Sequence, residues 1–441
     1  MVKRTTLALL ALLVLGVLLK PEIFYPWKET FIGSLDAPGW PGLVLAPSAE
    51  SAYAFWLRVE RNGETAEGAD LYYLASEIGP QSPDGLYARA RFDLGLPFKL
   101  GAATPILMKP SPRRDALTFE WSRRDERIVI GRIVCPGDVK VTIVHYVPWG
   151  LKGEYALLPD GEVRGRAGPD GQPVYLIWVS RPGEAAIAPP AGLAQTYTPD
   201  GNGVIAFAAG IGGSPTEIGN RITRYRNAEN IGDLIDEEAG VYEDKRVKLR
   251  GLYNGVAEAV TNSLHWNVLY QPGRHRFYLP AGRAAIQPRP DGSSDQWTVR
   301  GDNAFLGALA VSLESQKLAV DALAAVLETQ YPAGNIPGWR SRSSGSADRS
   351  QPPIGAYVVL KLFERLGDLE ILLNAYPALQ RWHDYWTATR PGGGIRRDGN
   401  GDGLLEWGSD TALLDKNVPS WEKNASGRMR AGWESGQDDL P

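Results

Sequence analysis

Two tryptophan-containing acidic motifs near the end of the chain combine groups that could bind and cleave a sugar. The segments 406–410 and 433–436 each place a carboxylate beside an indole ring and a Gly-Ser pair. Indole faces can pack against sugar C–H groups, and glycosidic hydrolysis needs a pair of acids. Either motif alone also fits surface acids beside a core tryptophan. The candidate sugar contacts in these motifs are Trp407, Asp410, Trp433 and Glu434.

Asp302 stands where a predicted apolar helix begins, followed by Asn303, Ala304 and Phe305. One interpretation is structural, because aspartate is a favoured N-cap residue. The other is catalytic, with Asp302 as a general acid. A helix N-terminus stabilises a carboxylate, so this role requires apolar burial or a neighbouring carboxylate to raise the pKa of Asp302.

Gln351 precedes two prolines and a second helical pattern. A proline in the first turn of a helix is ordinary, because its missing N–H would have no intrahelical partner there. The amide of Gln351 can both donate to and accept from a sugar hydroxyl. Helix punctuation and ligand contact therefore both remain open for this segment.

An acidic loop from 398 to 410 matches the first half of a calcium-binding EF-hand loop. The match fails at its twelfth position, where Ser409 replaces the bidentate glutamate, while Glu406 and Asp410 occupy the ninth and thirteenth positions. A turn with solvated acids is the alternative interpretation. The predicted Ca²⁺ ligands are Asp398, Asn400, Asp402, Leu404 and Glu406.

The composition indicates a globular protein that does not bind nucleic acid. The chain has 441 residues, 43% of them hydrophobic, and a net charge of -4 with both signs interspersed. Its length predicts two or three domains. The four histidines share no metal-ligand spacing, which gives a zinc site little support. With Cys135 as the single cysteine, no intramolecular disulfide can form.

Residues 1–21 have the features of an export leader. Lys3 and Arg4 precede an apolar stretch over 5–19, shorter than the roughly 20 residues that a membrane-spanning helix needs. No Ala-x-Ala-like cleavage site precedes Lys20, so a cleaved signal peptide and an uncleaved membrane anchor both remain open. We expect an extracytoplasmic protein, periplasmic or secreted.

Two kinds of apolar pattern divide the rest of the chain. Short runs rich in β-branched and aromatic residues predict an antiparallel β-sandwich over 22–231, with strands at 52–59, 69–75, 116–121, 127–134, 139–147, 174–179 and 203–208. Over 232–441, apolar residues recur at helical spacing, which predicts helices at 252–270, 305–313, 318–327, 357–366 and 369–386. Successive helices joined by loops predict αα-hairpins.

The motifs, taken together and in order, resemble those of one clan of glycosidases. This clan contains glycoside hydrolase family 63 and the trehalases. The likeness is to the bacterial family 63 α-glucosidases and the mannosylglycerate hydrolase-like enzymes. It rests on Asp302-Asn-Ala-Phe305, Gly334-Asn-Ile-Pro337, Gln351-Pro-Pro353, Glu364-Arg-Leu-Gly-Asp368, the segment 397–410 and Glu434-Ser-Gly436. Two places depart from the family: Gly301 stands where it has tryptophan, and the segment 437–441 differs from its usual continuation.

This resemblance implies a fold and a reaction. Such enzymes are (α/α)₆ barrels, often preceded by a β-sandwich, and they hydrolyse α-glycosides with inversion. Asp302 would be the general acid. In the clan the general base comes from later barrel helices, so we expect a partial barrel that lacks the base and is inactive as given. The resemblance and the motifs together imply sugar contacts at Trp297, Phe305, Trp339, Gln351, Trp407, Asp410, Trp433 and Glu434.

Two other functions remain open. The chain could be a non-catalytic carbohydrate-binding or surface protein with a degraded barrel, whose exposed apolar helix faces would favour association. It could also be a trehalase. In each case the predicted partner is an oligosaccharide or glycoside.

Overall fold

The structure is a computed structural model in which the described residues form a β-rich part followed by a helical part. These residues are 31–34, 42–48, 51–61, 64–67, 72–80, 86–93, 116–125, 127–146, 153–167, 174–188, 192–245, 250–251, 256, 264, 268–271, 276–279, 281–282, 298–341, 345–389, 397–398, 400–410, 413–414, 418 and 420–436. The predicted leader at 1–21 and Trp297 lie outside them.

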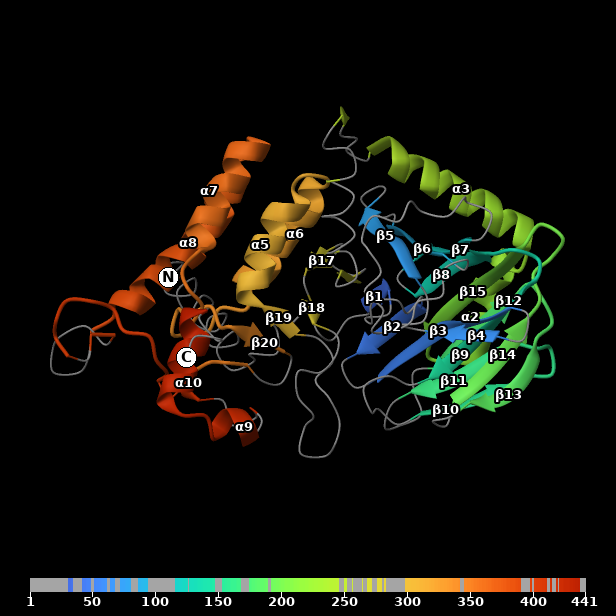
Figure 1. Ribbon diagram of the computed structural model, residues 1–441, viewed down its shortest axis with the longest axis horizontal. Helices are drawn as coiled ribbons and strands as arrows, with labels where there is room; N and C mark the ends of the chain where they lie inside the picture. Colours follow the sequence, from blue (N-terminus) through green and yellow to red (C-terminus); the bar gives the residue numbers. More distant parts are fainter. Residues whose placement is uncertain are drawn as a thin grey trace, which may run out of the picture.

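Two antiparallel sheets make up the β-rich part (Figure 1). The first sheet has the order β13 (Glu184–Ala188), β14 (Gly192–Tyr197), β9 (Val139–Tyr146), β3 (Ser51–Arg61), β2 (Gly42–Ser48), β1 (Phe31–Ser34), β16 (Leu269–Gln271) and β17 (Arg276–Tyr278), with β4 (Glu64–Glu67) paired to β3. The second sheet has the order β10 (Gly153–Leu157), β11 (Val163–Ala167), β12 (Val174–Val179), β15 (Val204–Gly212), β8 (Ile128–Val134), β7 (Ala116–Arg123), β6 (Leu86–Asp93) and β5 (Tyr72–Pro80).

The two sheets pack face to face through aromatic side chains. Phe55 of β3 makes edge-on contacts with Phe119 of β7 and Phe207 of β15, with ring centroids 6.0 and 5.5 Å apart. All three side chains are buried. Such pairs add about 0.5–1.5 kcal/mol to the stabilisation from area burial alone. The predicted β-sandwich followed by a helical region is therefore confirmed.

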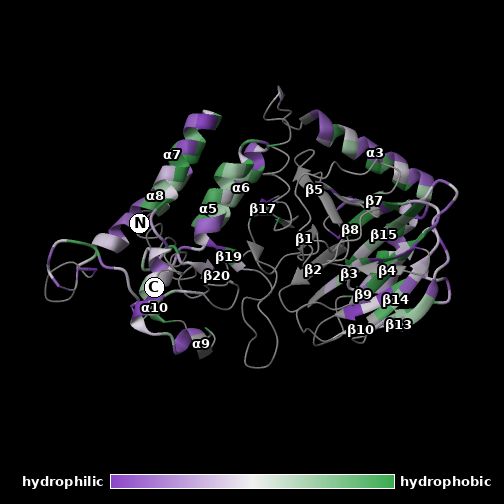
Figure 2. Ribbon diagram, in the orientation of Figure 1, coloured by the Kyte–Doolittle hydropathy of each residue, from purple (hydrophilic) through white to green (hydrophobic). Residues whose placement is uncertain are grey.

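Two helices cover the outer face of the second sheet. Helix α2 (Pro215–Ile222) starts at an N-cap serine, and α3 (Ala228–Lys245) crosses the strands beyond it. The helix α3 alternates hydrophilic and hydrophobic residues (Figure 2), and Ile231 and Ile235 pack into a cluster with Ile130 of β8. Asp236 forms an ion pair with Arg132 of the sheet. Because both faces are covered, β15 is apolar along almost its whole length.

The helical part consists of two hairpins in two layers. Helix α5 (Gly301–Val311) pairs with α6 (Gln316–Leu327), and α7 (Gly355–Leu366) pairs with α8 (Leu369–Thr387). Contacts between α5 and α7 form one layer, and contacts between α6 and α8 form the other. Gly367, in the left-handed conformation, ends α7, and the Asp368 carboxylate then caps α8. The short helices α9 (Ser420–Lys423) and α10 (Gly427–Ser435) follow.

Polar contacts join the sandwich to the first hairpin. The backbone N–H of Phe277 in β17 donates to Asp321 of α6 at 3.0 Å, and Arg276 forms an ion pair with Glu328. On the other side, the Tyr242 hydroxyl of α3 donates to Glu314 at 3.0 Å. A third, small sheet of β18 (Ala281–Gly282), β19 (Thr298–Arg300) and β20 (Trp339–Arg340) leads into α5.

The structure differs from the predicted element boundaries in two places. The helix predicted over 252–270 cannot reach its end, because Leu269 and Tyr270 lie in β16, paired with β1. Helix α3 runs across the expected domain boundary between 231 and 232, and β16 and β17 return the chain to the first sheet. The division at 231 relied on a change of pattern that marks the helix rather than the end of the sheet. The division of the chain into domains stays a prediction.

A search for membrane-spanning helices over the described residues found none long and apolar enough to cross a bilayer.

The first prediction concerns close packing at the start of α7. A Cβ atom on Gly355 would lie 2.8 Å from both Phe305 Cζ and Trp382 Cζ3, so alanine there must push apart two stacked rings. We expect Gly355→Ala to lower the free energy of unfolding by about 1–3 kcal/mol, measured by urea denaturation. Gly240→Ala in α3 is the control, since a Cβ there meets nothing within 4 Å and alanine favours helix. Equal stability of the two variants would contradict the packing argument.

The second prediction concerns His145, buried in the sandwich with its Nδ1 bonded to the Tyr53 hydroxyl. Burial lowers the pKa of His145 to about 3, from 6.5. Below pH 6.5 His145 is therefore protonated in the unfolded chain but stays neutral in the folded chain. The free energy of unfolding falls as the pH drops towards 3. Relative to His145→Gln, the wild type should lose up to about 1.4 kcal/mol per pH unit. His383→Gln is the control, because His383 is exposed. If the free energy of unfolding of the wild type and of His145→Gln changed with pH in parallel, the argument would be refuted.

Candidate active site

Asp302 lies inside the first turn of α5 and is not its cap. The N-cap residue is Arg300, which makes no side-chain capping bond, and Asp302 is the second residue of the helix. The side chain is half-buried, and its buried Oδ1 atom has no hydrogen-bond partner among the residues that the structure describes. The N-cap interpretation of Asp302 is therefore wrong.

Close backbone contacts bring Gln351 to the start of this helix. The N–H of Gly301 donates to the Gly338 carbonyl at 3.0 Å. A Cβ on Gly301 would lie 2.8 Å from the Pro337 oxygen and 3.0 Å from Gln351 Cγ, so no larger residue fits here. This chain therefore requires glycine at the position where the resemblance leads us to expect tryptophan. Gln351 itself is largely buried, and its amide lies against Gly338, 2.6 Å from where a Cβ would be.

Trp339 reaches the same place through strand pairing. In the small sheet Arg300 is paired with Trp339, which sets the backbone of Trp339 beside the start of α5. The Trp339 side chain is half-buried, and its backbone N–H donates to Ser346 Oγ at 3.2 Å. The structure thus gathers three of the predicted site residues, Asp302, Trp339 and Gln351, around one stretch of backbone.

Trp407 belongs to a second cluster, built on α8. Its ring is 43% exposed and stands edge-on to Trp386, with centroids 5.4 Å apart. Trp386 is buried, and no described residue forms a hydrogen bond with its Nε1. The same loop continues to Asp410, whose N–H donates to the Asp348 carbonyl at 2.7 Å. An exposed indole on a firm aromatic support suits stacking against a sugar ring.

Glu434 and Phe305 do not line an open site. Both have no exposed side-chain surface. Phe305 stacks on Trp382 at 5.7 Å between centroids, within the hydrophobic core. The Glu434 carboxylate accepts bonds from Ser350, Arg397 and Gly408. Direct sugar contact by these two residues is therefore wrong for this structure, because neither presents a surface to a ligand.

The neighbouring Trp433 is half-buried beneath a cation. The Arg349 guanidinium lies over its ring, 4.9 Å from the centroid. A cation–π contact of this kind fixes the indole in place. Stacking of Trp433 against a sugar stays a prediction.

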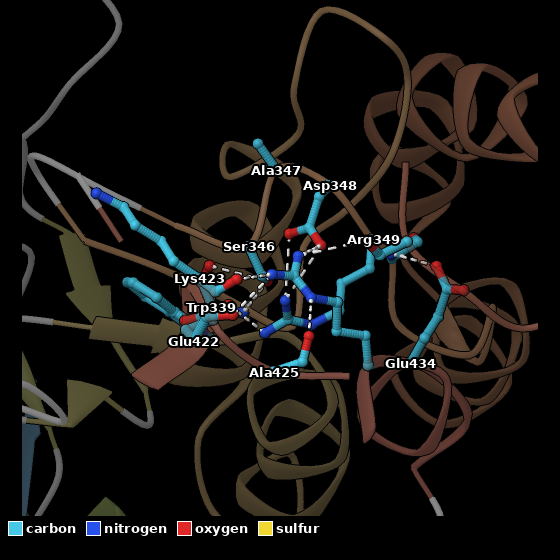
Figure 3. Close-up of polar contacts among 12 residues, drawn as sticks. Trp339, Ser346, Ala347, Asp348, Arg349, Glu422, Lys423, Ala425 and Glu434 are labelled. Carbon is cyan, nitrogen blue, oxygen red and sulfur yellow. Dashed lines mark hydrogen bonds and ion pairs between the residues drawn. The ribbon is translucent and has the colours of Figure 1, made fainter. Parts of the chain in front are cut away.

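A network of buried charges surrounds these segments (Figure 3). Asp348 accepts from Arg430 at 3.0 Å and from Arg349 at 3.2 Å, and Arg349 also pairs with Glu422. Arg430 donates in addition to the carbonyls of Glu422 and Lys423, at 2.7 and 2.9 Å. All four charged side chains of this network, Asp348, Arg349, Glu422 and Arg430, are buried. Burial raises the pKa of the Glu422 carboxyl, an effect that the Arg349 guanidinium opposes.

The sequence analysis missed this network. A local signal lies on α10, where Arg430 stands four residues before the buried Glu434, which is not part of this network, so that the two share one face of the helix. That spacing indicates a polar helix face but not that the face is buried. The other members are far apart in the chain, at 348–349 and 422. Only the folded arrangement brings them together.

The acidic loop uses its oxygens to hold its own turn. Asp398 Oδ1 accepts from the N–H groups of Gly401 and Asp402, at 2.8 and 3.1 Å, and Oδ2 accepts from Gly403 at 3.0 Å. Leu404 N–H donates to Asp402 at 2.8 Å. Within the described part of the chain, no group of three or more His, Cys, Asp or Glu residues is placed to hold a metal. Calcium binding at this loop stays a prediction.

Comparison with known proteins matches the region that carries this site. Residues 297–441 match the family model described as the mannosylglycerate hydrolase MGH1-like glycoside hydrolase domain. The resemblance predicted from the motifs is thus confirmed over this part of the chain. No curated protein matches the chain.

Three solved structures are similar at low identity. A bacterial glucoamylase complexed with acarbose has 11% identity and a TM-score of 0.45, covering 82% of this chain and 58% of its own. The inverting family GH92 mannosidase of Bacteroides thetaiotaomicron has 11% identity and a TM-score of 0.36, covering 88% and 66%. Another family GH92 glycosyl hydrolase has 13% identity and a TM-score of 0.28, covering 86% and 64%. The chain therefore spans 58–66% of the length of these proteins.

The buried network generates the third prediction. Arg430→Met removes the guanidinium that pairs with Asp348 and leaves that buried carboxylate with one cationic partner fewer. We expect a loss of about 3–5 kcal/mol in the free energy of unfolding, measured by urea denaturation. Arg428→Met changes an exposed arginine of the same helix and is the matched control. A loss below about 1 kcal/mol, as for an exposed pair, would show that the network is not a buried one.

Proposed function

We propose that the protein is an inverting α-glycoside hydrolase in which Asp302 is the general acid. The observation that carries the proposal is the buried Oδ1 of Asp302, for which the described part of the chain supplies no hydrogen-bond partner. This carboxylate lies on the helix whose start contacts Gln351 and Trp339. Similarity of residues 297–441 to a glycoside hydrolase domain supports the reaction class. The proposal includes export, since residues 1–21 have the features of a leader.

The proposed mechanism divides the work between positioning and proton transfer. The Gln351 amide bonds a sugar hydroxyl, and the indoles of Trp339 and Trp407 pack against ring faces. Asp302 then protonates the leaving glycosidic oxygen as the C–O bond breaks. Inversion requires a second carboxylate, about 6.5–9.5 Å from the first, to take a proton from the attacking water. We assign that general base to none of the carboxylates that the structure describes.

The proposed substrate is an α-mannoside or an α-glucoside. The name of the matched family, mannosylglycerate hydrolase MGH1-like, makes α-mannosylglycerate the first compound to test. Maltose tests an α-glucoside, and trehalose tests the trehalase alternative. Proton NMR of the first-formed anomer distinguishes inversion from retention for any of them.

A non-catalytic carbohydrate-binding or surface protein, whose exposed helix faces associate with a partner, is a second candidate. The observation in its favour is the apolar surface that α7 and α8 expose, on Tyr357, Leu360, Leu369, Leu373 and Tyr376. An exposed apolar surface of this kind is typical of a site that contacts another protein or chain segment. Sugar binding without hydrolysis by the longest reading frame that contains this chain would support this candidate.

The fourth prediction tests the acid. Asp302→Asn keeps the shape of the side chain but has no proton of suitable acidity to transfer, so we expect hydrolysis to fall by about 10²–10⁴. Binding should persist, because the surrounding contacts remain. The measurement is turnover and affinity for α-mannosylglycerate, maltose and trehalose, made on the 441-residue chain and on the longest reading frame that contains it.

Two further variants sharpen this test. Asp384→Asn changes an exposed carboxylate on α8 and should leave turnover unchanged. Asp438→Asn changes a carboxylate that follows α10 in the sequence and tests whether that group, which lies outside the described residues, is the acid instead. Retained hydrolysis by Asp302→Asn would overturn the assignment, and loss in Asp438→Asn alone would transfer the role to Asp438.

A further inference from the structure

The carboxylate of Glu434 joins three segments that are distant in the sequence. Its Oε1 accepts from the backbone N–H of Ser350 at 2.7 Å. Its Oε2 accepts from the backbone N–H of Gly408 at 2.5 Å and from the Arg397 guanidinium. The side chain has no exposed surface. Glu434 lies on α10, and its donors lie in the segment before α7 and in the acidic loop with the adjoining Arg397. One side chain therefore fixes the separation of these three segments.

Each of the two backbone donors adjoins a proposed sugar contact. Ser350 precedes Gln351, and its hydroxyl is itself fixed, accepting from Trp382 Nε1 at 2.7 Å and donating to the Ile336 carbonyl at 2.8 Å. Gly408 follows Trp407. Any shift of the carboxylate therefore moves the backbone beside Gln351, beside Trp407, or beside both.

Arg397 completes the attachment on the Trp407 side. Its guanidinium donates to the Gly408 carbonyl at 3.1 Å and to the Tyr385 hydroxyl. It also lies over the rings of Tyr385 and Trp386, 5.0 Å from each centroid. Trp386 is the ring that supports Trp407. The ion pair between Arg397 and Glu434 thus holds the loop of Trp407 against α8.

We propose that Glu434, held by Arg397, is a positioning residue that sets the separation between Gln351 and Trp407 across the sugar site. The inference rests on the proposed function, because it takes these two residues as sugar contacts. Glu434 neither touches the sugar nor transfers a proton. Its effect is on how well the two contacts fit one ring at the same time, and so on binding.

The Glu434→Gln substitution isolates this role, because it keeps the shape of the side chain and removes the charge. An amide has one acceptor oxygen, so it cannot accept from Ser350 on one side and from both Gly408 and Arg397 on the other. Its NH₂ group would face either the Gly408 N–H or the Ser350 N–H, and one of the two loops must shift. The ion pair with Arg397 is lost in either orientation.

The fifth prediction is that Glu434→Gln weakens sugar binding while the chemical step is preserved. The probe is whichever of α-mannosylglycerate, maltose and trehalose the wild type binds best. Its Kd is measured by isothermal titration calorimetry. We expect Kd to rise about tenfold or more. If the 441-residue chain or the longest reading frame that contains it hydrolyses the sugar, KM should rise by a similar factor, with kcat within about twofold of the wild-type value. Glu370→Gln, an exposed carboxylate on α8, is the matched control and should bind as the wild type does.

Arg397→Lys covers the case in which Glu434→Gln does not fold, as judged by circular dichroism. Lysine keeps the charge opposite Glu434 but loses the forked donors to Gly408 and Tyr385, so the same rise in Kd is expected. If both variants fail to fold, the pair is structural and the positioning role is overturned. A uniform fall in kcat without a change in KM would overturn it as well.

The outcomes separate this inference from the proposed function. If the wild type binds none of the three sugars, the proposed function fails and the positioning role fails with it. If the wild type binds a sugar and both folded variants bind it equally well, only the positioning role is overturned.

Discussion

The arrangement of the loops in the proposed site depends on one constraint, which is that each buried charged side chain must be paired with a group of opposite charge or a hydrogen-bond donor. Glu434 and Asp348 have no exposed side-chain surface, and Arg397, Arg349 and Arg430 are almost as deeply buried. An unpaired buried charge costs several kcal/mol, so the segments that carry the partners must assemble together or not at all. Burial raises the pKa of the Glu434 carboxyl, while Arg397 and the two backbone N–H groups oppose that rise. The same pairing that stabilises the carboxylate also holds the loops of Gln351 and Trp407 in place.

The more regular parts of the fold provide a rigid support for this network. Trp382, Tyr385 and Trp386 on α8 are buried, and each contacts a residue of the network or the site. Phe305 stacks on Trp382, which connects α8 to the helix that carries Asp302. The sandwich in turn contacts α6 through β17. The proposed sugar site is thereby attached to helices and sheets that do not need to move.

Sequence patterns predicted the regular elements because hydrophobic periodicity acts locally. The strands around Phe55 and Phe119 and the helices α6, α7 and α8 lie close to where the patterns place them. The pairing of Leu269 with Gly33 was not predictable, because it joins residues more than 200 positions apart. Among the site residues, Asp302, Trp339 and Gln351 lie around one stretch of backbone, and their roles stay predictions. Glu434 carries the right chemistry for a sugar contact, but its burial follows from partners at 350, 397 and 408, which no local spacing shows.

The central claim is that one buried carboxylate holds two loops at once. Hydrogen–deuterium exchange of the native protein, read on the amides of Ser350 and Gly408, tests it most directly. Both amides donate to Glu434, so we expect both to be protected and to exchange through the same opening, with equal free energies. Rapid exchange at either amide, or clearly different opening free energies, would contradict the account.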